Sequence, residues 1–434
     1  MTPEARRLLP SEYQRHLLRY DAVESSGFMH NMTRDLHMFC IWESARHRTD
    51  EILNAISAEL NIIASAEIEW TRSRSDENFN RLYGRDLRQT YSKSNDVGSG
   101  PFLYVVAEDT NPGYVFWRNV SGKVELTNPN VARAKQSARL SAMTDFPYSV
   151  HSSNSAAEFY RDSALILGAL RFRALLDDVE TGSAELDRVS SDLAGSDGWS
   201  SFGELADHLS LCCEYSFLRG DISDDRDREG DLDFLTRNCL DFAAVIGARR
   251  RNLDQSSGHF FAEVSGIRTH FDLRECGDNE IDPRWQEHML ITSSRQATEF
   301  LEPQLEDSYF YLLFHIALQK KRASQLRLDQ LETMRAKTGA PDEFQIDDTN
   351  REHAIRLISG WLRGRGFVIT TPQWPRNNLV VRRRRLRSWG APLSRRSSRV
   401  LAVNPLRSIR PLLGQISFLK KPVRLGRKLL LKLR

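Results

Sequence analysis

The sequence has little cysteine, and its cysteines are not spaced for metal binding or disulfide pairing. Among 434 residues there are five, and no two form a Cys-x-x-Cys pair: Cys40, Cys212, Cys213, Cys239 and Cys276. Zinc cages and disulfide frameworks depend on regular spacings, so we expect neither. This cysteine usage indicates a protein of a reducing compartment, the cytoplasm.

Long apolar runs are also missing. No run approaches the roughly 18 residues of a membrane-spanning helix, and Met1–Arg7 lacks the apolar segment of a signal peptide. Four common motifs are absent as well: the Walker A loop, G-x-G-x-x-G, G-x-S-x-G and H-E-x-x-H. The function classes that these motifs define are therefore not indicated. With 40% hydrophobic and 27% charged residues, the chain has the composition of a globular protein with two or three domains.

Acidic residues are absent from the last part of the chain. Residues 376–434 contain 18 Lys and Arg and no Asp or Glu, whereas residues 1–375 contain 43 basic and all 58 acidic residues. Leu, Ile, Val and Phe alternate with the basic residues from Val400 to Leu433, and such segments bind anionic lipid. We expect 376–434 to be either a membrane-surface tail that holds a cytoplasmic protein at the inner membrane or a disordered extension without a dedicated partner. A nucleic-acid-binding tail is the third and least favoured alternative, because the acidic body would oppose it.

The apolar periodicities predict a mixed α/β (α+β) fold. An N-terminal α/β domain covers residues 1–192, and a Gly- and Ser-containing stretch at 193–201 is interpreted as a linker. A second domain, with a mixed sheet and C-terminal helices, covers 202–375. Helices are expected at 28–58, 156–178, 202–213, 238–249, 285–290, 306–321 and in the first part of 352–371. Strands are expected at 62–70, 102–109, 115–118, 123–126, 215–219, 231–235, 260–264, 268–273 and at the end of 352–371.

Two stretches alternate apolar residues with carboxylates. Asp231 and Asp233 would point to the same face of one strand, because residues two apart in a strand share a face. Asp272 lies on a second strand. Mg²⁺ prefers hard oxygen ligands and keeps substrate phosphates in its coordination shell, and two such ions can clamp the oxygens of a transferring phosphoryl group. We therefore interpret Asp231, Asp233 and Asp272 as catalytic residues and as ligands of Mg²⁺ or Mn²⁺.

This spacing resembles the nucleotidyltransferase superfamily of the DNA polymerase β type. In that family an apolar strand ends in Gly-Ser, about ten residues follow, Asp-x-Asp or Asp-x-Glu comes on the next strand, and a later strand supplies a third carboxylate. Here Phe217-Leu218-Arg219-Gly220 ends the first strand, and Asp231-Leu232-Asp233 follows after ten residues. Asp272 fits the third position. The serine is missing, since Asp221 follows Gly220.

The resemblance covers about 215–275 and implies a nucleotide or phosphorylated sugar donor. Substrate-binding roles are then expected for Arg219 at the strand end, for Gly220, for His270 on the face of Asp272, and for Lys320 on a later helix. The alternative for His270 is simple packing, and the alternative for Lys320 is a solvated final helical turn.

A wider set of short motifs is spread over residues 28–371: Asn80–Gly84, Gly100-Pro101-Phe102, Asp109-x-Asn111-Pro112-x-Tyr114, His151-Ser152-Ser153-Asn154, Glu158-Phe159-x-x-Asp162, Gly277-Asp278, Asp282-x-x-Trp285 and Glu306–His315. This set resembles a group of bacterial proteins encoded among surface-polysaccharide genes. That resemblance implies a transferase for a glycan acceptor in capsule, exopolysaccharide or lipopolysaccharide assembly.

Other interpretations of these residues stay open. Residues 225–236 overlap a calcium-binding EF-hand loop, although Thr236 stands where a bidentate Glu is expected. An exposed acidic strand would explain Asp-Leu-Asp-Phe without chemistry. A non-catalytic assembly or regulatory protein of the same pathway would have kept the fold and lost the Gly-Ser.

The N-terminal half offers a weaker cluster at His151, Asn154, Glu158 and Asp162. We interpret it as a helix start, capped by Ser153 or Asn154, with Glu158 and Asp162 on the exposed face. Lys135 is a weaker phosphate-binding candidate.

Overall fold

The computed structural model describes residues 35–369 apart from gaps at 85–91, 119–123, 147, 183–185, 221–230, 251–257, 279, 320–324 and 339–350. Within these residues the fold is mixed α/β, as the sequence predicts. All of the described residues belong to one compact unit. None of the described helices combines the length and the apolar character that crossing a bilayer requires.

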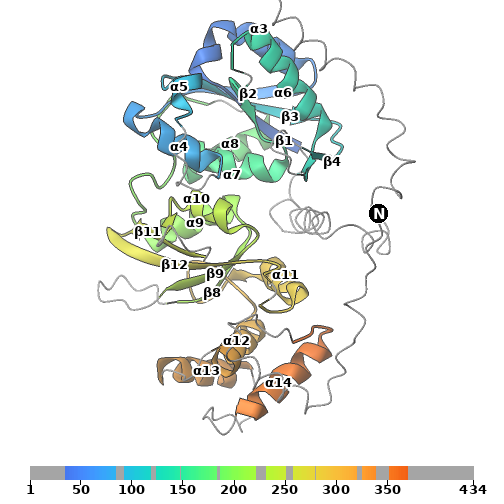
Figure 1. Cartoon of the computed structure of the whole chain (residues 1–434), viewed down its shortest axis with the longest axis vertical. Helices are drawn as coiled ribbons and strands as arrows, with labels where there is room; N and C mark the ends of the chain where they lie inside the picture. Colours follow the sequence, from blue (N-terminus) through green and yellow to red (C-terminus); the bar gives the residue numbers. More distant parts are fainter. Residues whose placement is uncertain are drawn as a thin grey trace, which may run out of the picture. The chain divides into compact units, whose positions relative to one another are not determined.

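The first sheet has five strands in the order β6-β1-β3-β2-β7, and Figure 1 labels the three central ones, β1, β3 and β2. Its neighbours are antiparallel except β2 and β7, which are parallel. A separate hairpin pairs β4 with β5, as predicted. The strands are β1 (Asp35–Ile41), β2 (Asn61–Glu69), β3 (Phe102–Asp109), β4 (Val115–Arg118), β5 (Val124–Thr127), β6 (Val150–Ser152) and β7 (Val189–Ser190).

The predicted helix at 28–58 is wrong over its described first part, where Asp35–Ile41 forms strand β1. Both faces of this strand are covered. Leu36, Met38 and Cys40 belong to one apolar cluster, and Phe39 and Ile41 belong to another. A strand buried on both faces has a continuous apolar run, which periodicity cannot distinguish from a buried helix.

Helices pack on both faces of this sheet. α3 and α6 share one apolar cluster with Phe39 and Val105, while α7 and α8 contribute Phe159 and Phe172 to the cluster on the other face. The helices of this part are η1 (Glu43–Arg48), α3 (Thr49–Ser57), η2 (Arg72–Arg74), α4 (Ser75–Leu82), α5 (Ser94–Val97), α6 (Pro129–Ala142), α7 (Ala156–Leu167) and α8 (Ala169–Thr181).

The predicted helix at 156–178 is divided in two at Gly168. This residue has a φ of +77°, a conformation that glycine adopts without the steric penalty of a Cβ. The predicted cap is also wrong, because Ser155 accepts the hydrogen bond from the Glu158 N–H at the start of α7. Nor does Asp162 lie on an exposed face, since its side chain is fully buried.

The second sheet also has five strands, in the order β10-β11-β12-β9-β8. β9 and β12 are parallel, and every other pair is antiparallel. The strands are β8 (Tyr215–Arg219), β9 (Leu232–Thr236), β10 (Arg249–Arg250), β11 (His259–Val264) and β12 (Ile267–Glu275), with a small separate pair of β13 (Ser294–Arg295) and β14 (Leu301–Glu302). The predicted hairpin turn at Ser265-Gly266 is confirmed, and both residues have positive φ.

Helices cover both faces of the second sheet as well. Most predicted helices are confirmed, but the one at 238–249 ends at Val245, before β10. The predicted strand near 371 is absent from residues 365–369, the described part that follows the last helix. The helices are α9 (Phe202–Cys212), α10 (Cys239–Val245), α11 (Pro283–Thr292), α12 (Leu305–Phe314), a π-helical turn (His315–Gln319), α13 (Gln325–Thr338) and α14 (Arg351–Gly364).

One apolar cluster takes side chains from both sheets. Met38 of the first sheet and Phe234 of the second belong to it, together with residues of α7, α8, α9 and α10. The predicted linker 193–201 contributes two buried residues, Leu193 and Trp199, to the same cluster. The other face of the second sheet packs through Leu218 and Leu235 against α11, α12 and α14. The predicted domain boundaries stay predictions.

Candidate functional site

Strand pairing places two of the predicted carboxylates side by side. β9 and β12 are parallel neighbours, and Asp233 lies directly opposite Asp272 in their register. Opposed residues of neighbouring strands point to the same face. Burial raises the pKa of Asp233, Arg219 lowers it, and the negative charge of Asp272 raises it further. Two carboxylates therefore share one small region of the sheet.

A β-bulge brings Arg219 to the same face. In the antiparallel pair of β8 and β9, Phe217 lies opposite Phe234, but the next pairing joins Arg219 to Asp233 and skips Leu218. Such an extra residue changes the face to which the following side chain points. The Arg219 Nε consequently forms an ion pair with the Asp233 Oδ2.

Gly220 stands at the end of β8, where a side chain has no room. Its φ is +148°, and a Cβ there would lie 3.0 Å from the Leu232 Cα and 2.5 Å from the Leu232 Cδ2. The glycine thus lets β8 end against the first residue of β9, immediately beside the two carboxylates.

Replacing this glycine should therefore destabilise the protein. We expect Gly220→Ala to lower the free energy of unfolding by roughly 1–3 kcal/mol, because Leu232 must move and the backbone is strained. Urea denaturation followed by circular dichroism measures this. Gly113→Ala is the matched control, because a Cβ at Gly113 meets nothing within 4 Å. Equal stability of the two variants would contradict the steric role of Gly220.

The remaining predicted site residues lie on or beside these strands or outside the described residues. Asp231 immediately precedes β9 and is half-buried. His270 lies two residues before Asp272 on β12, hence on the same face, and is also half-buried. Lys320 lies outside the described residues, as do positions 221–230 of the calcium-binding alternative.

A polar network lies beside these carboxylates. Arg274, two residues after Asp272, pairs with Glu280, whose Oε2 also accepts a hydrogen bond from the Gln319 Nε2 at 3.0 Å. The Gln319 Oε1 lies 2.5 Å from the His315 Nδ1, and the His315 Nε2 lies 3.2 Å from the Arg327 Nη1. From the sequence, His315 and Gln319 are expected to face the cleft on the same helix as Lys320. Arg274, Glu280 and Arg327 were not predicted, because they come from distant segments.

Two members of this network lie on a π-helical turn. His315 and Gln319 are both buried, at 3% and 6% exposure, on the turn that continues α12. π-Helical turns occur often at functional sites, where they reorient side chains. This turn aims two polar groups at Glu280 and Arg327 rather than at the apolar core.

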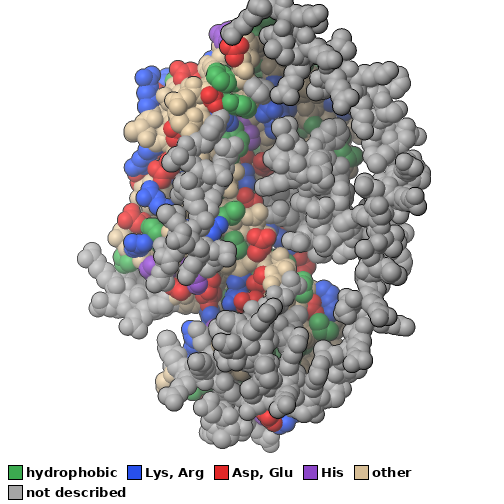
Figure 2. Space-filling model, viewed as in Figure 1, with side chains coloured by type: hydrophobic (Ala, Val, Ile, Leu, Met, Phe, Trp, Pro, Cys, Tyr) green, Lys and Arg blue, Asp and Glu red, His purple; other side chains and the backbone are tan. Residues whose placement is uncertain are grey.

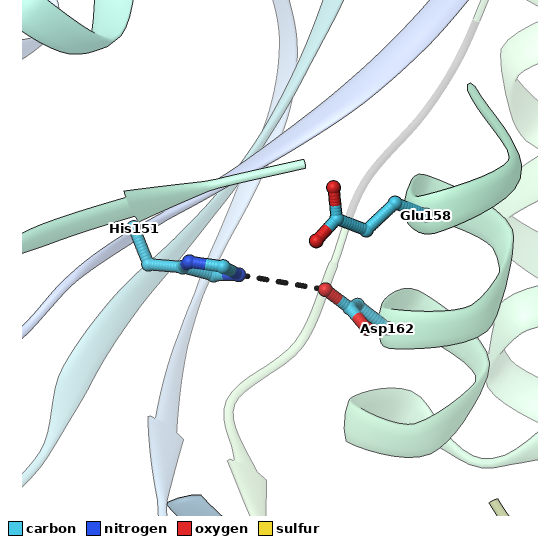
Figure 3. Close-up of side chains that lie close together, drawn as sticks. All are labelled: His151, Glu158 and Asp162. Atoms are coloured by element: carbon cyan, nitrogen blue, oxygen red, sulfur yellow. Dashed lines mark hydrogen bonds and ion pairs between the residues drawn. The ribbon is translucent and has the colours of Figure 1, made fainter. Parts of the chain in front are cut away.

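The first sheet carries a second polar cluster, formed by His151, Glu158 and Asp162 (Figure 3). His151 lies on β6, and the two carboxylates lie one turn apart on α7. One ligand atom from each residue falls within 4.8 Å of the others, and the His151 Nε2 is 3.4 Å from the Asp162 Oδ2. This set could hold a metal ion.

The charges around this second cluster are already compensated. Burial raises the pKa of Asp162 to about 6, although the neighbouring Arg161 guanidinium lowers it. Arg161 forms an ion pair with the Asp162 Oδ1 at 2.6 Å. Burial, together with Lys135, lowers the pKa of His151 well below its usual value, so the imidazole is neutral. The cluster is therefore a balanced buried network, and a cation would have to compete with Arg161 and Lys135.

Charged side chains outside these clusters are mixed. On the face that Figure 2 shows, acidic and basic side chains of the described residues are interspersed. The predicted basic tail, 376–434, lies outside the described residues. Comparisons with protein-family models, with curated proteins and with solved structures found no match for this chain.

Proposed function

We propose that the protein is a metal-dependent nucleotidyl- or phosphoryl-transferase of bacterial surface-polysaccharide synthesis. The observation that carries this proposal is the register of β9 and β12, which sets Asp233 opposite Asp272 on one face. The donor would be a nucleotide or a phosphorylated sugar, and the acceptor a glycan. The resemblance of residues 215–275 to nucleotidyltransferases and of 28–371 to polysaccharide-cluster proteins supports the reaction class and the pathway.

The donor set of the site suits a hard divalent cation. Asp233 and Asp272, with Asp231 immediately before β9, offer carboxylate oxygens, which Mg²⁺ and Mn²⁺ prefer. Such an ion would neutralise charge on a transferring phosphoryl group. Arg219 pairs with Asp233 in the present arrangement, so cation binding would release its guanidinium for another partner.

The two central carboxylates differ in exposure, which suggests different roles. The Asp233 side chain is 6% exposed and the Asp272 side chain is 24% exposed. Asp233 is therefore suited to hold a metal ion, whereas Asp272 can also reach an acceptor. We assign Asp272 the role of a general base that takes the proton from the acceptor hydroxyl.

Manganese binding tests this proposal without knowledge of the substrate. We expect Mn²⁺ to raise the melting temperature of the wild-type protein, because a ligand that binds the native state stabilises it. Asp272→Asn should weaken Mn²⁺ binding by at least about tenfold in calorimetric titration, since even outer-shell partners of a metal contribute that much. Asp197→Asn is the matched control, because this carboxylate is 81% exposed and pairs with Arg74.

An equal Mn²⁺ affinity of wild type and Asp272→Asn would overturn the metal site. With nucleotide donors, Asp231→Ala and Asp233→Ala should abolish metal-dependent turnover, and unchanged turnover would overturn the catalytic assignment.

A non-catalytic member of the same pathway is the second candidate. The Arg219–Asp233 ion pair and the missing serine after Gly220 favour it, because both reduce what the site offers to a metal-bound triphosphate. Such a protein would show no Mn²⁺-dependent stabilisation, so the same titration separates the two candidates.

A further inference from the structure

Three buried donor atoms near the carboxylates have no acceptor among the described residues. They are the Arg219 Nη1, the Arg274 Nε and the Tyr311 Oη. Tyr311 is only 2% exposed. Leaving a buried donor unpaired costs free energy, so such atoms are rare in folded proteins and call for an explanation.

The three donors belong to one region of the molecule. Arg219 and Arg274 lie on the face of the second sheet that carries Asp233 and Asp272. Tyr311 comes from α12, whose residues pack with Leu218 and Leu235 of that face. Burial raises the pKa of Tyr311 to about 12, and the charges of Arg274 and Arg219 act on its hydroxyl. The hydroxyl is therefore protonated at neutral pH and able to donate.

A third arginine, on another element, lies near Arg219 and Asp233. Arg327 of α13 interacts electrostatically with both Arg219 and Asp233. Guanidinium groups match the oxygen geometry of phosphates, to which they can donate two hydrogen bonds at once.

We infer that Arg219, Arg274 and Tyr311 form an anion subsite for the diphosphate group of the donor. Each contributes one buried donor atom without a partner among the described residues, Nη1, Nε and Oη respectively. The inference rests on the proposed function for the identity of the donor, but the anion subsite can be tested without metal or turnover.

The sharpest test removes only the tyrosine hydroxyl. Because the Tyr311 Oη has no partner in the described structure, Tyr311→Phe should leave the melting temperature unchanged or raise it. The same variant should bind inorganic pyrophosphate roughly tenfold more weakly, as expected for the loss of one hydrogen bond to a charged group. Isothermal titration of pyrophosphate, in metal-free buffer at constant ionic strength, gives the affinities.

The matched control is Tyr104→Phe in the first sheet. The Tyr104 hydroxyl is equally buried but donates to the Ser163 Oγ at 2.6 Å, so its removal should lower the melting temperature and leave pyrophosphate affinity unchanged. Arg274→Lys supplies a second test, because an ammonium keeps the charge but lacks the guanidinium geometry, and it should also weaken pyrophosphate binding.

The outcomes distinguish the two proposals. Undetectable pyrophosphate binding to the wild type, or equal affinity of wild type and Tyr311→Phe, overturns the anion subsite even where Mn²⁺ binds. Pyrophosphate binding that weakens in Tyr311→Phe supports the anion subsite. If Mn²⁺ does not bind to the same protein, only the proposed metal-dependent transfer reaction is overturned.

Discussion

Replacing Arg81 with Met is expected to lower the free energy of unfolding by about 3–5 kcal/mol. Arg81 lies at the end of α4, is 5% exposed, and donates hydrogen bonds to the backbone oxygens of Ala194, Ala244 and Val245 and to the Ser196 Oγ. Each buried carbonyl that loses its donor costs roughly 1–3 kcal/mol. Burial lowers the pKa of Arg81 to about 10, so the side chain remains charged at neutral pH.

The measurement is urea denaturation of wild type, Arg81→Met and two comparison variants. Arg81→Lys keeps the charge, but a single ammonium cannot reach four acceptors, so it should recover only part of the loss. Arg188→Met removes an arginine that is 56% exposed and pairs with Glu67 and Glu69, and it should cost less than about 1 kcal/mol. A loss below 1 kcal/mol in Arg81→Met would show that these carbonyls do not depend on Arg81.

Removing His208 is expected to make the protein more resistant to acid. His208 of α9 is 1% exposed, and neither ring nitrogen has a partner among the described residues. Burial, aided by the charge of Arg81, lowers the pKa of His208 to about 3. An unfolded histidine has a pKa of about 6.5. Below that pH the unfolded state therefore binds a proton that the folded state does not.

The direction of the pH effect on stability follows from this difference in proton binding between the folded and unfolded states. The stability associated with the neutral His208 is fully present above pH 6.5 and is lost as the pH falls toward 3. At 1.36 kcal/mol per pH unit, the wild type should lose roughly 2–3 kcal/mol by pH 4.5 through this residue. His208→Leu should lack that component, and at pH 8 it should be at least as stable as the wild type, because two unpaired buried nitrogens are gone.

Urea midpoints between pH 8 and 4.5 test the prediction. The comparison variant is His47→Leu, because His47 is exposed and its replacement should leave the pH profile of the wild type in place. Parallel profiles for wild type and His208→Leu would mean that His208 is not held neutral in the folded protein.

Local sequence pattern predicted the elements of the second sheet well. The strand at Tyr215–Arg219 and the hairpin around Ser265-Gly266 are found as expected, because alternation and turn chemistry act between near neighbours. The strand at Asp35–Ile41 was not predicted, because its sequence lacks such an alternation. Helices cover both of its faces, which removes the alternation that would have identified it.

In the candidate site, too, local sequence pattern predicted some features and could not predict others. The sequence indicated that Asp233 and Asp272 lie on strands and point away from Phe234 and Phe271. It could not indicate that their strands are parallel neighbours in matching register, since that depends on how distant segments pair. Nor could it indicate the bulge that turns Arg219 toward Asp233, because a bulge is a property of the pairing of two strands.

By itself, the sequence determined the mixed α/β class, the alternation that puts carboxylates on strand faces, and the separation of acidic body from basic tail. These follow from composition and from contacts between near neighbours along the chain. The tertiary structure alone decided that Arg274, Glu280 and Tyr311 lie near the carboxylates, and that His208 and Arg81 are buried together. Burial and electrostatic environment depend on long-range packing, which no local pattern of residues specifies.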